Sequence, residues 1–154
     1  MTMRRARGMT LIELMTTISI AAILTMIAVP SFTKIIALQR VKSASSNLQV
    51  ALLTGRSEAI KRNANVTVKS NAASADWSSG WKVADGTTST VIANYPATSN
   101  LTITGPASGV TYQSSGRISA TASTTFKVSS SSITDVRCVT ITVMGVPTVT
   151  TSGC

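Results

Sequence analysis

The feature that most constrains this chain is a long apolar run close to its N-terminus. Between Met9 and Phe32 the only charged side chain is Glu13. A helix of this length spans about 36 Å, which is enough to cross the hydrocarbon core of a bilayer with some tilt. Three arginines among the first seven residues predict that the N-terminus stays in the cytoplasm. The rest of the chain is then expected outside that membrane.

Glu13 needs an explanation of its own. A carboxylate inside a membrane costs at least about 2.5 kcal/mol on insertion scales, so it indicates a functional group that has a partner. Two simpler interpretations are a cleaved secretory signal and a plain membrane anchor. The apolar core is longer than that of a secretory signal, and its end, IAVPSF, offers only a weak cleavage site at Ala28. A plain anchor leaves Glu13 without a role.

The composition argues against an enzyme. The 154 residues include no histidine and two cysteines, and the acids are Glu13, Glu58, Asp76, Asp85 and Asp135. No zinc cluster or Ser/His/Asp triad can be built from this set. The spacing of the acids does not point to the paired carboxylates of a glycoside hydrolase either. We therefore expect no catalytic activity, no metal site and no cofactor.

Beyond Pro30 a second helical segment is expected. Apolar residues recur there at helical spacing, while most Lys and Arg fall on other faces. The members of this apolar stripe are Phe32, Ile35, Ile36, Val41, Ala44, Leu48, Ala51, Leu52 and Ala59. The pattern predicts one helix that continues to about Arg62 and packs its stripe on a sheet. Near its end Glu58 is spaced to pair with Lys61 and Arg62.

After Asn63 the pattern changes to short segments rich in β-branched residues, separated by Gly, Pro, Asn and Ser. Strands are predicted at residues 65–69, 80–84, 89–93, 101–105, 109–113, 124–130 and 137–143. These segments would form an antiparallel meander or two small sheets. The expected class is α+β, with a long N-terminal helix packed on a small antiparallel β domain.

The two cysteines, Cys138 and Cys154, lie at the C-terminal end of the part expected outside the membrane. A disulfide between them would close a loop of about sixteen residues and contribute on the order of 3 kcal/mol. The alternative is two free thiols. An oxidising compartment, and the poor placing of a thiol at an exposed chain end, favour the disulfide.

The string from Gly8 to Glu13, GMTLIE, resembles the processing site of type IV prepilins and type II secretion pseudopilins. The resemblance implies that a prepilin peptidase cuts between Gly8 and Met9 and methylates the new N-terminus. Most relatives have Phe where this chain has Met9. Glu13 would then pair with the N-terminal amine of a neighbouring subunit and fix the register of assembly.

Three further strings, GRSEAIKRNANVTV, DWSSGWKV and TYQSSGR, resemble the GspH/FimT family of minor pilins and pseudopilins over essentially the whole chain. The resemblance implies that Trp77 and Trp81 are core residues and that Gly80 is a turn position. It also implies that other pilins and the prepilin peptidase are partners. Before assembly, the chain would reside in the inner membrane with its globular domain in the periplasm.

These observations together predict four segments. They are a leader at residues 1–8, a transmembrane and filament-core helix at 9–29, an amphipathic helical half at 30–62 and a β domain at 63–154. The expected function is that of a minor subunit that primes or enters a type IV pilus or a type II secretion pseudopilus.

The alternative function is DNA uptake, because one branch of the family is associated with natural transformation. Relatives in that branch often carry a Gly-Arg-x-Arg string in the last strand, where this chain reads MGVPT without arginine. The net charge of +9 could still favour DNA, an anionic lipid or an acidic protein, or could serve only solubility. Arg117, Lys127 and Arg137 are the candidates for phosphate contacts, and they could converge on one face.

Overall fold

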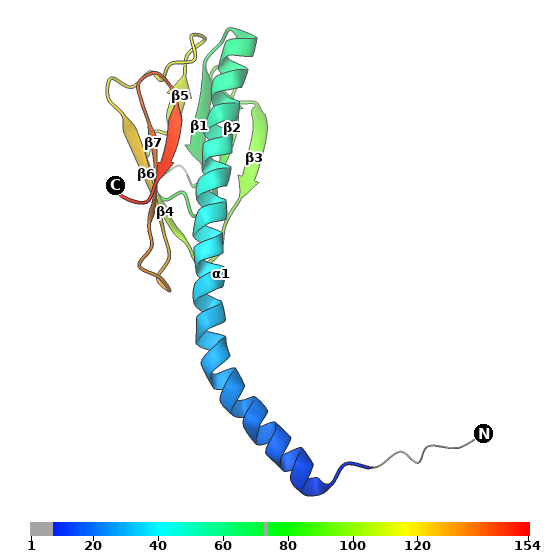
Figure 1. Ribbon diagram of the computed structural model, residues 1–154. Helices are drawn as coiled ribbons and strands as arrows, with labels where there is room; N and C mark the ends of the chain where they lie inside the picture. Colours follow the sequence, from blue (N-terminus) through cyan, green and yellow to red (C-terminus); the bar gives the residue numbers. More distant parts are fainter. Residues whose placement is uncertain (1–7, 73) are drawn as a thin grey trace, which may run out of the picture. The chain divides into compact units, whose positions relative to one another are not determined.

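The computed structural model describes residues 8–72 and 74–154. The chain divides into two compact units, of which the second spans Ile36–Cys154. One helix, α1 (Leu11–Arg62), contributes residues to both units, and it is the first element in Figure 1. The prediction of a single helix that ends near Arg62 is confirmed.

In the described part of the chain, eight strands follow the helix and form two four-stranded antiparallel sheets. The strands are β1 (Val66–Ser70), β2 (Gly80–Asp85), β3 (Val91–Pro96), β4 (Thr102–Thr104), β5 (Val110–Tyr112), β6 (Thr124–Ser129), β7 (Arg137–Ile141) and β8 (Pro147–Thr150). The first sheet has the order β3-β2-β1-β5 and the second the order β4-β6-β7-β8. The α+β class is confirmed, with two small sheets rather than one meander.

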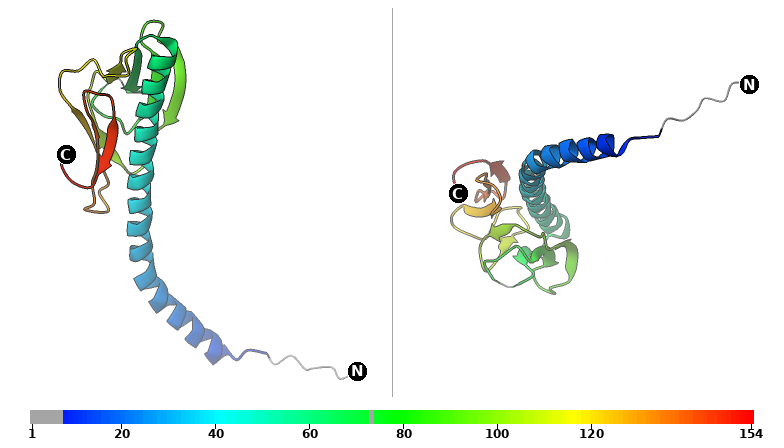
Figure 2. Two further views of the ribbon diagram at one scale, coloured as in Figure 1. Left: turned by 45° about the horizontal axis from the view of Figure 1, so that its top comes forward. Right: turned by 90° about the horizontal axis from the view of Figure 1, so that it is seen from below.

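Within the second unit, the two sheets share one core with the C-terminal part of α1. Figure 1 shows β3 on one side of the helix and β6 and β7 on the other, and Figure 2 shows the same arrangement from two further directions. The helical residues of the core include Val41, Leu48 and Leu52, which are fully buried. They meet the inward residues of the strands, such as Val68 and Phe126.

The buried stripe of the helix begins later than the spacing predicts. Phe32, Ile35 and Ile36 were expected in the stripe, but they are 62%, 59% and 49% exposed. The first member of the predicted stripe that is buried is Val41, and Ala37, which was not predicted, is buried before it. The reason is that apolar spacing cannot say where the sheets begin to cover the helix, so the stripe and the exposed run that precedes it look alike in sequence.

Strand β8 is the one strand that the sequence pattern did not predict. It starts with Pro147 and reads PTVT, so it lacks the alternation of large apolar residues that marks β6. Proline is tolerated there because β8 is an edge strand and Pro147 is its first residue. β8 pairs with β7 from Cys138 opposite Thr150 to Ile141 opposite Pro147.

The two tryptophans are core residues, as the resemblance implies. Trp77 is fully buried and Trp81 is 1% exposed. Between them Gly80 has a φ of +91°, a backbone angle that residues with a side chain rarely adopt. A Cβ there would also lie 2.8 Å from the carbonyl carbon of Pro96, so only glycine fits where β2 begins beside β3.

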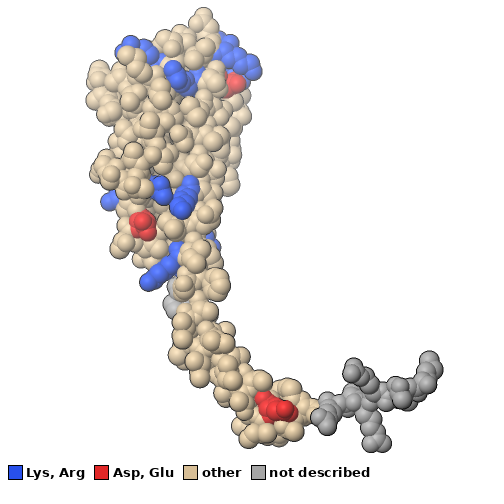
Figure 3. Space-filling view, viewed as in Figure 1, with Lys and Arg blue, Asp and Glu red and all other residues tan. Residues whose placement is uncertain are grey.

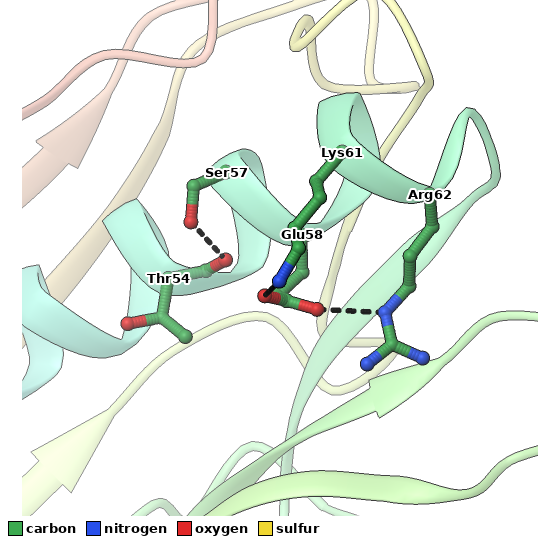
Figure 4. Close-up of polar contacts among 5 residues, drawn as sticks. All are labelled: Thr54, Ser57, Glu58, Lys61 and Arg62. Carbon is green, nitrogen blue, oxygen red and sulfur yellow. Dashed lines mark hydrogen bonds and ion pairs between the residues drawn. The ribbon is translucent and has the colours of Figure 1, made fainter.

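The last turn of the helix carries the ion pairs that its spacing predicts. Arg62 Nε lies 2.7 Å from one carboxylate oxygen of Glu58, and Lys61 Nζ lies 3.7 Å from the other. Figure 4 shows the three side chains together on one face of the helix. The hydrogen bond from Arg62 holds the pKa of Glu58 below its ordinary value. Asn63 then ends the helix with a φ of +49°.

A disulfide joins Cys138 to Cys154, with the two Cα atoms 5.4 Å apart. Cys138 lies on β7 and is buried, whereas Cys154 is the exposed last residue. The bond therefore ties the end of the chain back onto the second sheet beside β8.

Removing this disulfide is expected to lower the free energy of unfolding of the β domain by about 3 kcal/mol, because it closes a loop of sixteen residues. Urea unfolding of the fragment 36–154, followed by circular dichroism, measures the loss in Cys154→Ser. Reduction of the original fragment should give the same loss, and reduction of Cys154→Ser should change nothing further. Equal stability with and without the bond would contradict the prediction.

Candidate functional site

The N-terminal turn of α1 holds Glu13 in a capping box. The Glu13 carboxylate accepts hydrogen bonds from the backbone N–H and the hydroxyl of Thr10, both at 2.9 Å. In return the Thr10 hydroxyl accepts the backbone N–H of Glu13 at 3.3 Å. This reciprocal arrangement satisfies donors that every helix N-terminus leaves free. Glu13 thus has an intrachain role, which the Thr-x-x-Glu spacing signals and which the assembly interpretation alone misses.

The residues around Glu13 expose apolar side chains in every direction. Leu11, Ile12 and Met15 are 76%, 72% and 60% exposed, and the pattern continues to Val29. An 18-residue window of α1 has a mean hydropathy of 2.1 and no part of it is buried inside the structure. By length and composition this is one helix that could cross a membrane. A helix that is apolar all round needs lipid or other helices to cover it.

Gly8 and Met9 precede the helix, and both are exposed. A Cβ built on Gly8 would meet no other atom within 4 Å. The fold of the chain itself therefore does not require glycine at this position. Any requirement for Gly8 must come from a partner that binds this segment.

The three cations considered for phosphate contacts do not come together. Arg117 follows Gly116, whose carbonyl accepts a hydrogen bond from Arg56 Nε at 3.1 Å. Arg137 instead lines a hollow with Lys42, Ser45, Ser46, Gln49 and Val149. The Arg137 hollow therefore lies beside α1 near residue 45, and the Arg117 segment lies beside α1 near residue 56. These two parts of the helix are roughly 20 Å apart along its axis.

Lys127 points away from both. It is exposed on β6 and pairs with Cys138, whereas its neighbour Val128 is buried and pairs with Arg137. Because neighbouring residues of a strand leave opposite faces, Lys127 lies on the outer face of the second sheet and Arg137 on the core face. On the face shown in Figure 3, the Lys and Arg side chains form separated groups rather than one patch.

No metal centre is evident in the part of the chain that the structure describes. Residues 8–72 and 74–154 contain no group of three His, Cys, Asp or Glu side chains that could hold a metal ion. A hollow lined by α1 residues from Val50 to Ile60 carries no acid or histidine.

Comparisons with known proteins agree with this arrangement. Residues 44–145 match the family model of the type II transport protein GspH, and residues 3–29 match that of the prokaryotic N-terminal methylation motif. The comparison with curated proteins gave no match.

Two crystal forms of the type IV minor pilin FimU from Pseudomonas aeruginosa PAO1 have similar structures. One has a TM-score of 0.61 at 20% identity and covers 71% of this chain and 91% of the other. The second has a TM-score of 0.60 at 18% identity and covers 75% and 90%. At this identity the likeness shows a shared pilin fold.

The methylation motif implies processing by a prepilin peptidase and other pilins as partners, and it fits anchoring in the inner membrane through the apolar helix. The family model for GspH matches well over half of the residues. The chain therefore belongs to the GspH family and is a pilin-like subunit of a type IV pilus or a type II secretion pseudopilus.

Proposed function

We propose that this chain is a minor subunit that is made as an inner-membrane precursor, cleaved between Gly8 and Met9, methylated on Met9 and drawn into the filament through α1. The observation that carries the proposal is the exposed apolar N-terminal part of the helix, which holds a single acid. Before assembly lipid covers this surface, and in a filament the helices of other subunits cover it.

Glu13 acts in the filament as a register device. Cleavage creates an amine on Met9 inside an apolar environment, where an isolated charge is costly. A carboxylate from the next subunit offsets part of that cost, so a subunit is favoured at the depth where its Glu13 meets another subunit's amine. The capping bonds to Thr10 occupy one carboxylate oxygen, Oε2, and leave Oε1 for the amine.

Before assembly, the β domain lies in the periplasm. The arginines before the apolar segment support a cytoplasmic N-terminus. The disulfide between Cys138 and Cys154 supports an oxidising compartment for the other end of the chain. Both observations give the same single-pass orientation.

DNA uptake is the second function considered, and assembly is favoured over it. Phosphate binding needs several cations on one face. Arg117, Lys127 and Arg137 lie at three separate places on the β domain. The last strand, which in relatives of the DNA-uptake branch often carries arginines, has none here.

Replacing Gly8 with glutamate is expected to block cleavage and to exclude the chain from filaments. The structure leaves open space around Gly8, so the change acts on recognition by the peptidase rather than on folding. Intact mass of the purified protein reports the processing, and immunoblots of sheared filaments and membranes report the location. The original chain should begin at a methylated Met9. An uncleaved chain that still enters filaments would overturn the proposal.

A further inference from the structure

A hollow of about 210 Å³, lined mainly by polar and charged residues, lies between α1 and the second sheet. Its lining residues are Lys42, Ser45, Ser46, Gln49, Arg137 and Val149. Two of these already have partners: Gln49 Nε2 donates to the Pro147 carbonyl at 3.3 Å, and the Ser45 hydroxyl donates to the Lys42 carbonyl at 2.8 Å. The first bond holds the helix beside edge strand β8.

Neither cation of this hollow makes an ion pair within the described residues. Arg137 is half-buried on the core face of β7, and a guanidinium offers five donors. Both ion pairs among the residues that the structure describes use Glu58 instead of a partner for Arg137 or Lys42. Two like charges that line one hollow repel each other, so an anion that enters between them is favoured.

The acids of the chain are committed elsewhere. Asp76 accepts the backbone N–H of Ser78, and Asp85 accepts those of Thr87 and Thr88, each at 2.8 Å. These bonds hold the pKa values of both carboxyls below the ordinary value, so both remain charged within their own turns.

Of the remaining acids, Glu58 is paired and Glu13 lies in the apolar N-terminal segment. Only Asp135 is left to meet a cation of a second copy. Cleavage after Gly8 removes three arginines, so a mature copy keeps eleven Lys and Arg against five acids, a side-chain charge of +6, and two such copies repel each other. An acidic side chain of a different protein therefore fits this hollow better than a second copy does.

A partly exposed strip of α1 continues directly from the hollow. Lys42, Ser46, Gln49, Leu53, Arg56 and Ile60 follow one another at steps of three and four residues, which places them on one face of the helix. Leu53 and Ile60 are 44% and 51% exposed, and with Val50 and Arg56 they line a second hollow of about 470 Å³. The surface thus offers Lys42 and Arg137 at one end, and at the other the apolar side chains of Val50, Leu53 and Ile60 around Arg56.

We infer that this strip binds a segment of a different pilin-like subunit, which places an Asp or Glu carboxylate in the hollow beside Lys42 and Arg137 and apolar side chains along Leu53 and Ile60. The inference rests on the proposed function as a filament subunit. It favours a protein over nucleic acid because Arg137 is half-buried and the exposed side chains of Leu53 and Ile60 follow along the strip, whereas a phosphate backbone needs a row of accessible cations.

The test uses the full chain in its own cells. A photoreactive p-benzoylphenylalanine replaces Ser46, and the cross-linked peptide is identified by mass spectrometry. We expect a peptide from another pilin-like subunit that contains an Asp or Glu. Arg137→Glu should lower both the cross-link and the amount of the chain in sheared filaments more than about tenfold, with cleavage at Gly8 unchanged. Replacing the acid of the cross-linked peptide with arginine should restore both in Arg137→Glu.

Arg117→Glu is the matched control, because it makes the same charge change at a distant place and should leave both readouts unchanged. Arg137→Gln, checked for an unchanged Tm in detergent, should reproduce the loss without a charge reversal. A cross-link to a second copy, or full incorporation of Arg137→Glu, would overturn the inference. So would duplex DNA binding by the purified full chain that is lost in Arg137→Gln. If the original chain itself is absent from filaments, the proposed function fails instead.

Discussion

Glu13→Gln is expected to be cleaved after Gly8, to accumulate in the membrane and to be absent from sheared filaments. Glutamine also occurs at this position of a capping box, so the hydrogen bonds with Thr10 can remain while the charge is lost. What disappears is the attraction for the amine of a neighbouring subunit, which in a low dielectric is then a buried charge without a partner. Glu13→Ala, which removes both the cap and the charge, should fail equally.

Thr10→Ala is the variant that separates the two roles of Glu13. It removes the hydroxyl bonds and weakens the helix start by about 0.5–2 kcal/mol, but it leaves the carboxylate in place. It should be cleaved and should enter filaments. For every variant, intact mass reports cleavage, and immunoblots of membrane and filament fractions report where the chain is. Filament entry by Glu13→Gln, or its loss in Thr10→Ala alone, would show that Glu13 acts through the cap.

The helix and most strands were predictable because their signals are local. In β6 the alternation of exposed and buried residues around Phe126 and Val128 marks a strand whatever its neighbours are. The ion pairs of Glu58 follow from spacing along one helix in the same way. The order of the strands was not predictable, because β5 returns to pair with β1 after β4 has joined the other sheet.

The candidate sites also differ in whether their signals are local in the sequence. The Gly8–Glu13 string and the Thr-x-x-Glu cap can be read from consecutive residues. The hollow beside Arg137 cannot, because Lys42 and Arg137 are far apart in sequence and meet only when β7 packs beside α1. Lys42 is absent from the residues predicted from the sequence for this reason. Arg117 and Arg137 look alike in sequence, and only the fold shows that their segments lie beside different parts of α1.

Trp77 is the residue whose loss is expected to cost the β domain most. It precedes β2 of the first sheet, yet its backbone N–H donates to the Ile103 carbonyl of β4 in the second sheet at 2.8 Å. Its indole N–H donates to the Pro106 carbonyl at 3.3 Å, and its ring meets Phe126 edge to face at 4.7 Å between centroids. A Cβ on Gly105 would collide with both rings, so the loop is fitted tightly around the pair.

Trp77→Ala is therefore expected to lower the free energy of unfolding of the fragment 36–154 by about 3–5 kcal/mol, through lost burial and an unfilled cavity between the sheets. That is a large share of the roughly 5–15 kcal/mol typical of a domain, and part of the sample should be unfolded in buffer. Urea unfolding, monitored by circular dichroism, measures the loss. If the alanine variant does not fold, Trp77→Phe is measured instead, and its loss should be smaller. Met144→Ala removes a large side chain that is 57% exposed and should change stability by less than about 0.5 kcal/mol. A loss below about 1 kcal/mol in Trp77→Ala would mean that the two sheets do not depend on this residue for their packing.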